Sequence, residues 1–332
     1  MSDNASQPNL LLPTANSSGT AFDRDKLKAS ISGLADKGIY IGTSSWKYPG
    51  WRGMLYQEDR YIYRGKFSET RFDRLCLGEY AEVFKSVCVD AAYYKFPDER
   101  YLKNLVSEVP EDFLFTFKVT DDITIKQFPE LPRFGLRAGR PNEHFLNADL
   151  FAAAFLKPCE EFKKNIGLLM FEFSRFGPHD FARGRDFVEA LDQFLGKLPK
   201  GWRYGVEIRN RNFLHPDYFE MLARHGVTHV YNSWAEMPPV SDQLELPGSV
   251  TNPEFAGARL LLKPGRKYQE AVDKFKPYDR LKEPYEDVRV AAAKLIKKAL
   301  AKEGLSKLFL YVNNRLEGNA LQTIIAILEK LT

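Results

Sequence analysis

Eight short apolar runs recur along this 332-residue chain, and longer amphipathic segments separate them. The runs span residues 39–43, 87–90, 113–118, 166–171, 204–209, 227–231, 259–263 and 308–312. Near-continuous apolar runs are typical of strands buried on both faces, as in a parallel sheet. Strands that alternate with helices predict an α/β protein, and eight is the number that closes a (β/α)₈ TIM barrel. A doubly wound open sheet is the second possibility.

Helix signals lie between these runs. We expect helices over residues 72–84, from Pro97 onward, and over residues 216–225, 288–300 and 319–331. Gly226 directly follows the third of these helices and is a typical C-terminal stop.

The first 22 residues are rich in Ser, Asn and Pro and predict a disordered tail. The remainder, residues 23–332, is expected to form a single barrel domain. Three stretches are long for loops in a compact domain, namely residues 46–68, 123–142 and 231–257. Long structured loops are usually functional.

Composition excludes several classes of protein. The chain has 48 basic and 44 acidic residues, and this mild excess is not that of a dedicated nucleic-acid binder. Three irregularly spaced cysteines make no disulfide framework, which favours a cytoplasmic protein with reduced thiols. No apolar run approaches the roughly 20 residues that a membrane helix needs, so we expect no membrane partner.

Several catalytic motifs are absent. The chain contains no GxxxxGK[ST], GxGxxG, HExxH or GxSxG sequence. Its five histidines are scattered, and none follows a predicted strand. We therefore expect no tightly bound metal and no cofactor.

Specific motifs stand at the two ends of the barrel region. IGTSSWKYPGWRGMLY at 41–56 and LYVNNRLEGNA at 310–320 resemble the YecE-like family. Four further segments follow in the family's order, at 84–97, 113–124, 167–176 and 204–213. The resemblance covers residues 38–330 and implies a barrel without an established reaction. This chain departs from the usual family residues at Cys88, Asp90, Glu172, Asn210 and Lys263, which implies a divergent member.

In barrels the C-terminal strand ends carry the chemistry. Three carboxylates there, Asp90, Glu172 and Glu207, are the candidate catalytic residues. Glu207 has apolar neighbours, so it must point into the barrel or pair with a cation. We interpret it as a general acid or base, or as the structural ion-pair partner of Arg209.

Glu172 comes from the neighbouring strand. With Glu207 it could form the acid–base pair of a glycosidase-like hydrolase. The structural alternative is an ion pair with Arg175 or Lys118.

Candidate substrate-binding residues also follow the strands: Lys118, Arg209, Lys263, Trp46, Tyr48, Tyr93, Asn313 and Asn314. Lys118, Arg209 and Lys263 follow alternate strands, which share interior layers, so they are expected to surround one anion. Lys118 could instead form a Schiff base or pair with Glu172 or Asp121. Trp46, Tyr48 and Trp51, in the loop after the first strand, could stack a ligand or plug the barrel top, and the asparagines could cap the last helix.

The leading hypothesis is a metal-independent enzyme that acts on an anionic substrate, phosphorylated or nucleotide-like. One alternative is a non-catalytic barrel that binds nucleic acid. The other is the glycosidase-like hydrolase that uses Glu172 and Glu207.

Overall fold

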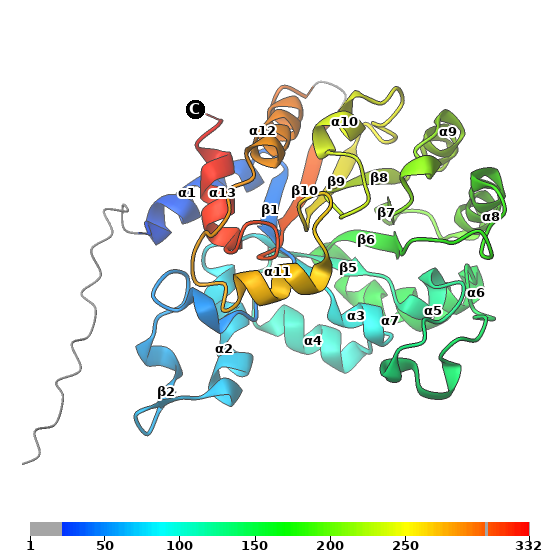
Figure 1. Cartoon of the computed structure of the whole chain (residues 1–332). Coiled ribbons are helices and arrows are strands. Elements are labelled where there is room, and N and C mark those ends of the chain that lie inside the picture. The colour runs from blue at the N-terminus through cyan, green and yellow to red at the C-terminus, as the bar shows by residue number, and fades with distance from the viewer. Residues whose placement is uncertain (1–21, 303–304, 332) are drawn as a thin grey trace, which may run out of the picture.

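The computed structural model describes residues 22–302 and 305–331. Its main strands are β1 (Ile39–Thr43), β4 (Ser86–Val89), β5 (Leu114–Lys118), β6 (Ile166–Phe173), β7 (Tyr204–Ile208), β8 (Thr228–Asn232), β9 (Phe255–Leu260) and β10 (Lys307–Val312). They form one parallel sheet in the order β1-β10-β9-β8-β7-β6-β5-β4. The sheet curls into a nearly closed barrel with helices around it (Figure 1), which confirms the predicted (β/α)₈ fold.

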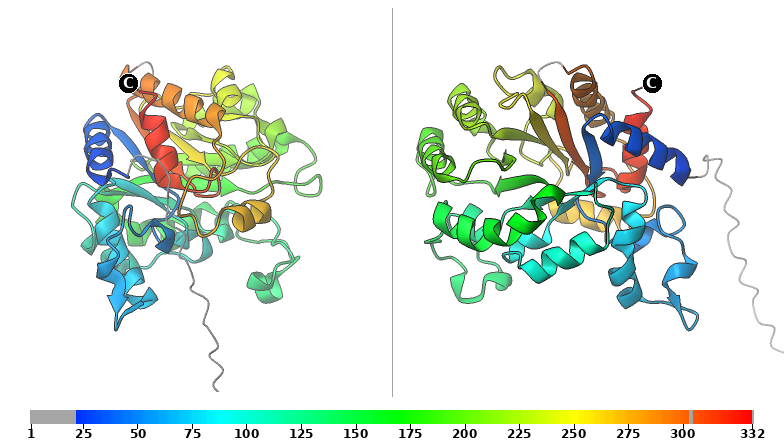
Figure 2. Two further views of the ribbon diagram at one scale, coloured as in Figure 1. Left: turned by 60° about the vertical axis from the view of Figure 1, so that its left-hand side comes forward. Right: turned by 180° about the vertical axis from the view of Figure 1, so that it is seen from behind.

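The helices cover the outside of the sheet. They are α1 (Arg24–Ala35), α2 (Glu69–Ala81), α3 (Ala91–Tyr94), α4 (Glu99–Ser107), α5 (Asp121–Thr124), α6 (Ala148–Leu150), α7 (Lys157–Cys159), α8 (Gly184–Lys197), α9 (Pro216–His225), α10 (Val240–Glu245), α11 (Tyr268–Phe275), α12 (Glu286–Leu300) and α13 (Ala320–Leu328). Seen from behind, the first and last of these, α1 and α13, lie toward the same side of the barrel (Figure 2, right). None of the helices in the described part of the chain is long and apolar enough to cross a membrane. The predicted tail lies outside the described residues except for Phe22.

Local sequence signals set several helix ends. The side chains of Asp23, Ser68 and Asp98 accept hydrogen bonds from backbone N–H groups in the first turns of α1, α2 and α4. Helix α9 spans the predicted residues and ends at Gly226, whose φ of 65° is a left-handed conformation that favours glycine.

Strand β9 begins and ends earlier than predicted. The apolar residues 260–262 suggested a strand over 259–263, whereas the ladder spans Phe255–Leu260. The small residues of 256–258 gave a weak strand signal, but they pair in register with β10. Arg259 therefore lies near the C-terminal end of a strand, and Lys263 lies in the loop beyond it.

A tyrosine joins the two edge strands of the sheet. The hydroxyl of Tyr80 accepts a hydrogen bond from the backbone N–H of Thr43 on β1 and donates one to the carbonyl of Ser86 on β4, both at 3.0 Å. A Cβ at Gly42 would lie 2.1 Å from that same carbonyl oxygen, so the close approach of the strands requires glycine. The hydroxyl thus replaces a ladder hydrogen bond at the seam of the barrel.

The barrel interior contains a small cluster of its own. Its buried members are Cys88, Leu168, Met170, Val230, Phe255, Phe309 and Tyr311. The hydroxyl of Tyr311 crosses the interior to Ser86 and Thr116, each at 2.6 Å. Because side chains alternate along a strand, the residue two positions after an inward-facing one also faces inward. At the ends of two of these strands that next inward residue is charged. Cys88 leads to Asp90, and Met170 leads to Glu172.

Candidate functional site

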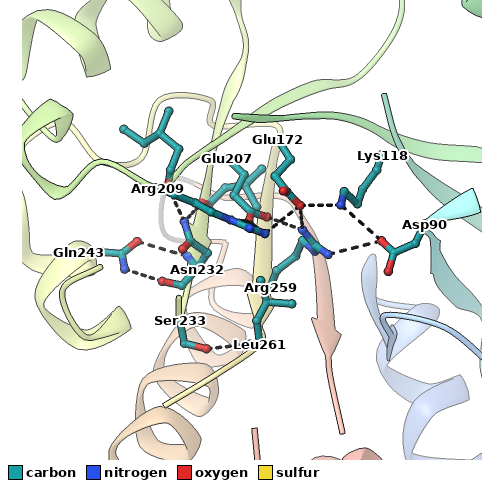
Figure 3. A network of polar contacts seen from close by, with 12 residues as sticks. Asp90, Lys118, Glu172, Glu207, Arg209, Asn232, Ser233, Gln243, Arg259 and Leu261 are labelled. Atoms are coloured by element: carbon teal, nitrogen blue, oxygen red, sulfur yellow. Dashed lines mark hydrogen bonds and ion pairs between the residues drawn. The ribbon is translucent and has the colours of Figure 1, made fainter. Parts of the chain in front are cut away.

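Six charged side chains meet at the C-terminal ends of the strands (Figure 3), and we call them the mouth network. They are Asp90, Lys118, Glu172, Glu207, Arg209 and Arg259. Five of these were predicted from the sequence as site residues. Arg259 is not among the predicted site residues, because the strand was expected to end at residue 263, whereas β9 ends at Leu260.

Glu172 is the centre of the mouth network. Its Oε2 atom lies 2.7 Å from Nζ of Lys118, 2.9 Å from Nη2 of Arg209 and 2.8 Å from Nη1 of Arg259. Of the two structural partners considered for Glu172, Lys118 is present, while Arg175 pairs with Glu236 instead. One carboxylate oxygen thus faces three cations.

Glu207 and Asp90 complete the network. Oε2 of Glu207 lies 2.9 Å from Nη1 of Arg259, and its Oε1 lies 3.3 Å from Nη2 of Arg209. The contacts of Asp90 are looser, because its Oδ1 lies 3.5 Å from Arg259 and 3.9 Å from Lys118. Three carboxylates therefore face three cations, so the network as a whole is charge-balanced.

Charge pairing shifts the pKa values of Glu172, Lys118 and Arg259. Burial tends to lower the pKa of Arg259, but the carboxylates around the guanidinium outweigh burial and raise this pKa. Burial tends to raise the pKa of Glu172, but the positive charges of Arg209, Lys118 and Arg259 outweigh it and hold the pKa well below 4.5. Burial tends to lower the pKa of Lys118, but Glu172 and Asp90 outweigh it, so the pKa lies above 10.5. A Schiff-base lysine needs the neutral amine, and this setting disfavours it.

The three carboxylates differ in their access to solvent. Glu207 is 0% exposed and Glu172 is nearly as buried, whereas the Asp90 side chain is 36% exposed. An arginine lies between Glu172 and Glu207, where a glycosidase would hold its sugar. A glycosidase acid also needs a raised pKa, which is the opposite of what Glu172 has. This geometry disfavours the glycosidase-like alternative.

Lys263 lies outside the mouth network. Its ammonium group lies 3.5 Å from Oε1 of Glu283 and is partly exposed. Asp121, considered as a partner for Lys118, pairs with Arg133 at 2.9 Å. In place of Lys263, Arg259 supplies the cation from β9.

Aromatic rings support two of the cations. Nζ of Lys118 lies 3.9 Å from the ring centre of Tyr93, and the guanidinium carbon of Arg209 lies 3.7 Å from that of Trp234. Tyr48 packs against Trp51, which is fully buried. These two rings contact each other in the loop after β1, while Tyr93 and Trp234 border the charged site.

The two asparagines after β10 are buried, and their side chains form hydrogen bonds with neighbouring segments of the chain. Oδ1 of Asn313 accepts a hydrogen bond from the backbone N–H of Arg315. Oδ1 of Asn314 accepts one from the backbone N–H of Ala320 and one from the indole N–H of Trp51. The contact with Ala320, the first residue of α13, agrees with the capping interpretation. Asn319 is the N-cap residue itself.

Beside the mouth network lies a pocket of about 290 Å³, which we call the arginine pocket. Arg175, Arg209, Arg211 and Glu236 supply its charged side chains. Asn210 fixes its wall, because its side-chain amide bonds both the N–H and the carbonyl of Phe176, at 2.8 and 2.9 Å. This pocket carries a cation excess that the mouth network lacks.

The described side chains include no evident metal-binding cluster and no reactive thiol. Within the described residues, no group of three or more His, Cys, Asp or Glu side chains could hold a metal ion. The three cysteines are free and buried, and burial raises the pKa of Cys88 to about 12. A thiol with that pKa is a poor nucleophile at neutral pH.

Comparison with known proteins identifies a family whose model matches most of the chain. The profile described as "Protein of unknown function DUF72" matches residues 40–332. The UPF0759 protein YecE of Escherichia coli K12 is 25% identical over 182 residues, which are 54% of this chain and 50% of that protein. The alignment thus spans about half the length of the curated relatives it matches.

Solved structures show the same fold. A DUF72 family protein of Enterococcus faecalis V583 aligns with a TM-score of 0.58 at 19% identity, covering 88% of this chain and 95% of its own. A second, from Thermotoga maritima MSB8, gives a TM-score of 0.55 at 19% identity, covering 88% and 96%. At this identity the likeness concerns the fold alone.

Proposed function

The chain belongs to the DUF72 family of proteins of unknown function, and from this premise we propose that its barrel binds an anionic small molecule in the arginine pocket. The observation that carries the proposal is the position of Arg209. This side chain lines the pocket and is also fixed by Glu172 at 2.9 Å and Glu207 at 3.3 Å. An anion receptor held rigid before binding loses less side-chain entropy when the ligand arrives.

The charges of the arginine pocket favour an anion. Of its three arginines, Arg175 pairs with Glu236 at 2.9 Å and Arg209 pairs with the two buried glutamates, which leaves Arg211 as the cation in excess. Arg211 is exposed, and the described residues offer it no ion-pair partner. The planar fork of a guanidinium binds phosphate or carboxylate through two parallel hydrogen bonds. Phosphorylated compounds therefore fit this pocket well.

Apolar surface in the arginine pocket suits a ring attached to the anionic group. Phe176, Phe181 and Phe213 line it together with the arginines. A flat aromatic floor beside a cationic wall suits a nucleotide or sugar phosphate. This composition supports the phosphorylated or nucleotide-like substrate of the leading hypothesis.

The acid–base roles of Asp90, Glu172 and Glu207 stay predictions. In this proposal the two buried glutamates position Arg209, and Asp90, the most exposed of the three carboxylates, does not line the arginine pocket. The balanced charges of the mouth network explain why the binding site would lie beside it rather than within it.

The test is a calorimetric binding screen of inorganic phosphate, sugar phosphates and nucleotides against three proteins. Wild type should bind at least one of these compounds, and Arg211→Gln should weaken that binding about tenfold because one charge-assisted contact is lost. Arg100→Gln removes an exposed arginine of α4 that does not line the pocket, and it should bind like wild type.

Two outcomes contradict the proposal. One is a wild type that binds none of the phosphate compounds, and the other is an Arg211→Gln variant with unchanged affinity. Short oligonucleotides belong in the same screen. If only they bind, with affinity that falls steeply as salt rises, the nucleic-acid alternative replaces this proposal.

A further inference from the structure

A second pocket, of about 330 Å³, lies where the barrel closes between β1 and β4. We call it the seam pocket. The loop after β1, the end of β4 and the helices α2 and α4 form its walls. It shares no lining residue with the arginine pocket. The two pockets are therefore separate candidate sites.

The seam pocket has the opposite charge. Asp73, Asp90 and Glu108 line it, against one cation, Lys47. Lys47 lies 3.4 Å from Asp73, and both side chains are largely exposed. Within the described residues Glu108 has no ion-pair partner, while Asp90 also belongs to the mouth network, where Arg259 and Lys118 lie 3.5 and 3.9 Å from its Oδ1.

Buried polar atoms at the seam pocket lack hydrogen-bond partners. Trp46 lines the pocket and is only 7% exposed, yet its indole Nε1 has no partner among the described residues. Oδ1 of Asp90 likewise accepts no hydrogen bond, because its cations lie 3.5 Å away or more. A buried N–H without a partner is unfavourable, so such groups usually bind a ligand or a water molecule.

The loop that carries Trp46 is well anchored. The Trp46 carbonyl accepts hydrogen bonds from the Tyr56 hydroxyl and, at 2.9 Å, from the backbone N–H of Tyr48. Thr43 also holds this loop, since its hydroxyl donates to the carbonyl of Ser45 at 2.6 Å. The unpartnered indole N–H therefore belongs to a rigid wall.

We propose that the seam pocket binds a small organic cation that also carries an oxygen acceptor, such as an amino alcohol or an amino sugar. The ammonium group would face Asp90 and Glu108, and the oxygen would accept the hydrogen bond of the Trp46 indole. The rings of Trp46 and Tyr101 add surfaces that favour a cation.

The protonation of Glu108 agrees with this assignment. Its side chain is exposed overall, but the partial burial of its carboxyl group raises the pKa above 4.5, and the nearby charge of Lys47 lowers this pKa by less. An ammonium group in the seam pocket would stabilise the ionised carboxylate and lower this pKa. Binding should therefore release protons at mildly acidic pH.

The test uses matched pairs of probes on the full chain, measured by isothermal titration calorimetry. Glucosamine is compared with glucose and ethanolamine with ethylene glycol, because each pair differs by an amine in place of a hydroxyl. Wild type should bind at least one amine at least about tenfold more tightly than its neutral counterpart, the difference expected for one charge-assisted contact.

Three variants locate the site. Glu108→Gln should weaken amine binding about tenfold through the lost charge, and Trp46→Phe about fivefold through the lost donor. Glu111→Gln, an exposed glutamate outside the seam pocket, is the matched control and should bind like wild type. Circular dichroism checks that the variants fold.

The proposal is overturned if neither amine binds, or if the neutral compounds bind equally well. It is also overturned if Glu108→Gln retains wild-type affinity, since that residue is exposed and its substitution leaves the core intact. These results are independent of phosphate binding to the arginine pocket, because the two pockets have different lining residues.

Discussion

Glu172 and Glu207 are register partners on β6 and β7, and both accept from a single nitrogen, Nη1 of Arg259, at 2.8 and 2.9 Å. Two buried carboxylates on neighbouring strands would repel each other without this shared cation. Arg209 bridges the same pair from the other side. The two arginines thus offset the repulsion between these neighbouring carboxylates inside the barrel mouth.

The first prediction concerns Arg259→Ala. Removing this guanidinium takes one cation from Glu172 and leaves the fully buried Glu207 with only the 3.3 Å contact to Arg209, so the free energy of unfolding should fall by about 3–5 kcal/mol. Urea denaturation measures the loss. Arg211→Ala removes an exposed arginine and should change stability by less than about 0.5 kcal/mol. Equal stability of the two variants would mean that Arg259 is not needed to hold the carboxylates.

A second prediction follows from the low pKa of Glu172. Its folded-state pKa lies below the unfolded value near 4.5, so the unfolded chain takes up the proton first as the pH falls. The stabilisation is fully present above about pH 5 and is lost as the pH drops below 4.5 towards the folded-state value. Glu172→Gln lacks this titration.

Urea denaturation between pH 7 and pH 3 tests this prediction. At pH 7 wild type should be more stable than Glu172→Gln by about 3 kcal/mol, and the difference should shrink as the pH falls below 4.5. A difference that stays constant over this range would show that Glu172 does not titrate at a low pKa in the folded protein.

The third prediction concerns the seam of the barrel. Tyr80→Phe removes the hydroxyl that joins Thr43 to Ser86 and leaves a buried N–H and a buried carbonyl without partners. The expected cost is about 1–3 kcal/mol of unfolding free energy. Tyr63→Phe, at an exposed tyrosine, is the control and should be neutral. An equally stable Tyr80→Phe variant would show that water can replace the hydroxyl.

The fourth prediction concerns His229 on β8. Burial lowers its pKa to about 3, so the ring stays neutral in the folded protein while the unfolded chain titrates near 6.5. Protonation of this histidine in the unfolded chain therefore lowers the free energy of unfolding progressively as the pH falls below 6.5. In NMR spectra the His229 ring signals should not shift between pH 8 and pH 5. A titration midpoint near 6.5 would contradict the packed, neutral ring.

The fold followed from local patterns in the sequence. Strand β1 and helix α9 span the residues that the apolar runs and the glycine stop predicted. The error at β9 arose because small residues such as Gly257 carry little apolar signal, although they pair as well as any others in a ladder. Such positions suit a crowded interior, where a Cβ at Gly257 would lie 3.0 Å from Leu168.

The site was predictable in part. The rule that strand ends carry polar side chains selected Asp90, Lys118, Glu172, Glu207 and Arg209, which do meet. It also selected Lys263, because the strand was expected to end at residue 263. Strand β9 ends at Leu260, and Lys263 lies outside the mouth network. Arg259 lies two residues after Gly257, which faces the barrel interior. The alternation of side chains along the strand therefore predicts that Arg259 also points inward.

The sequence by itself determined the barrel, the order of its elements and the kinds of charged residue at its mouth, because those depend on periodicity along the chain. Only the tertiary structure decided which charges meet. Pairing depends on the register between strands, as between Glu172 and Glu207, and on contacts between distant segments, as between Arg259 and Asp90. The tertiary structure also separated the pockets, because a pocket forms only where loops from several strands come together.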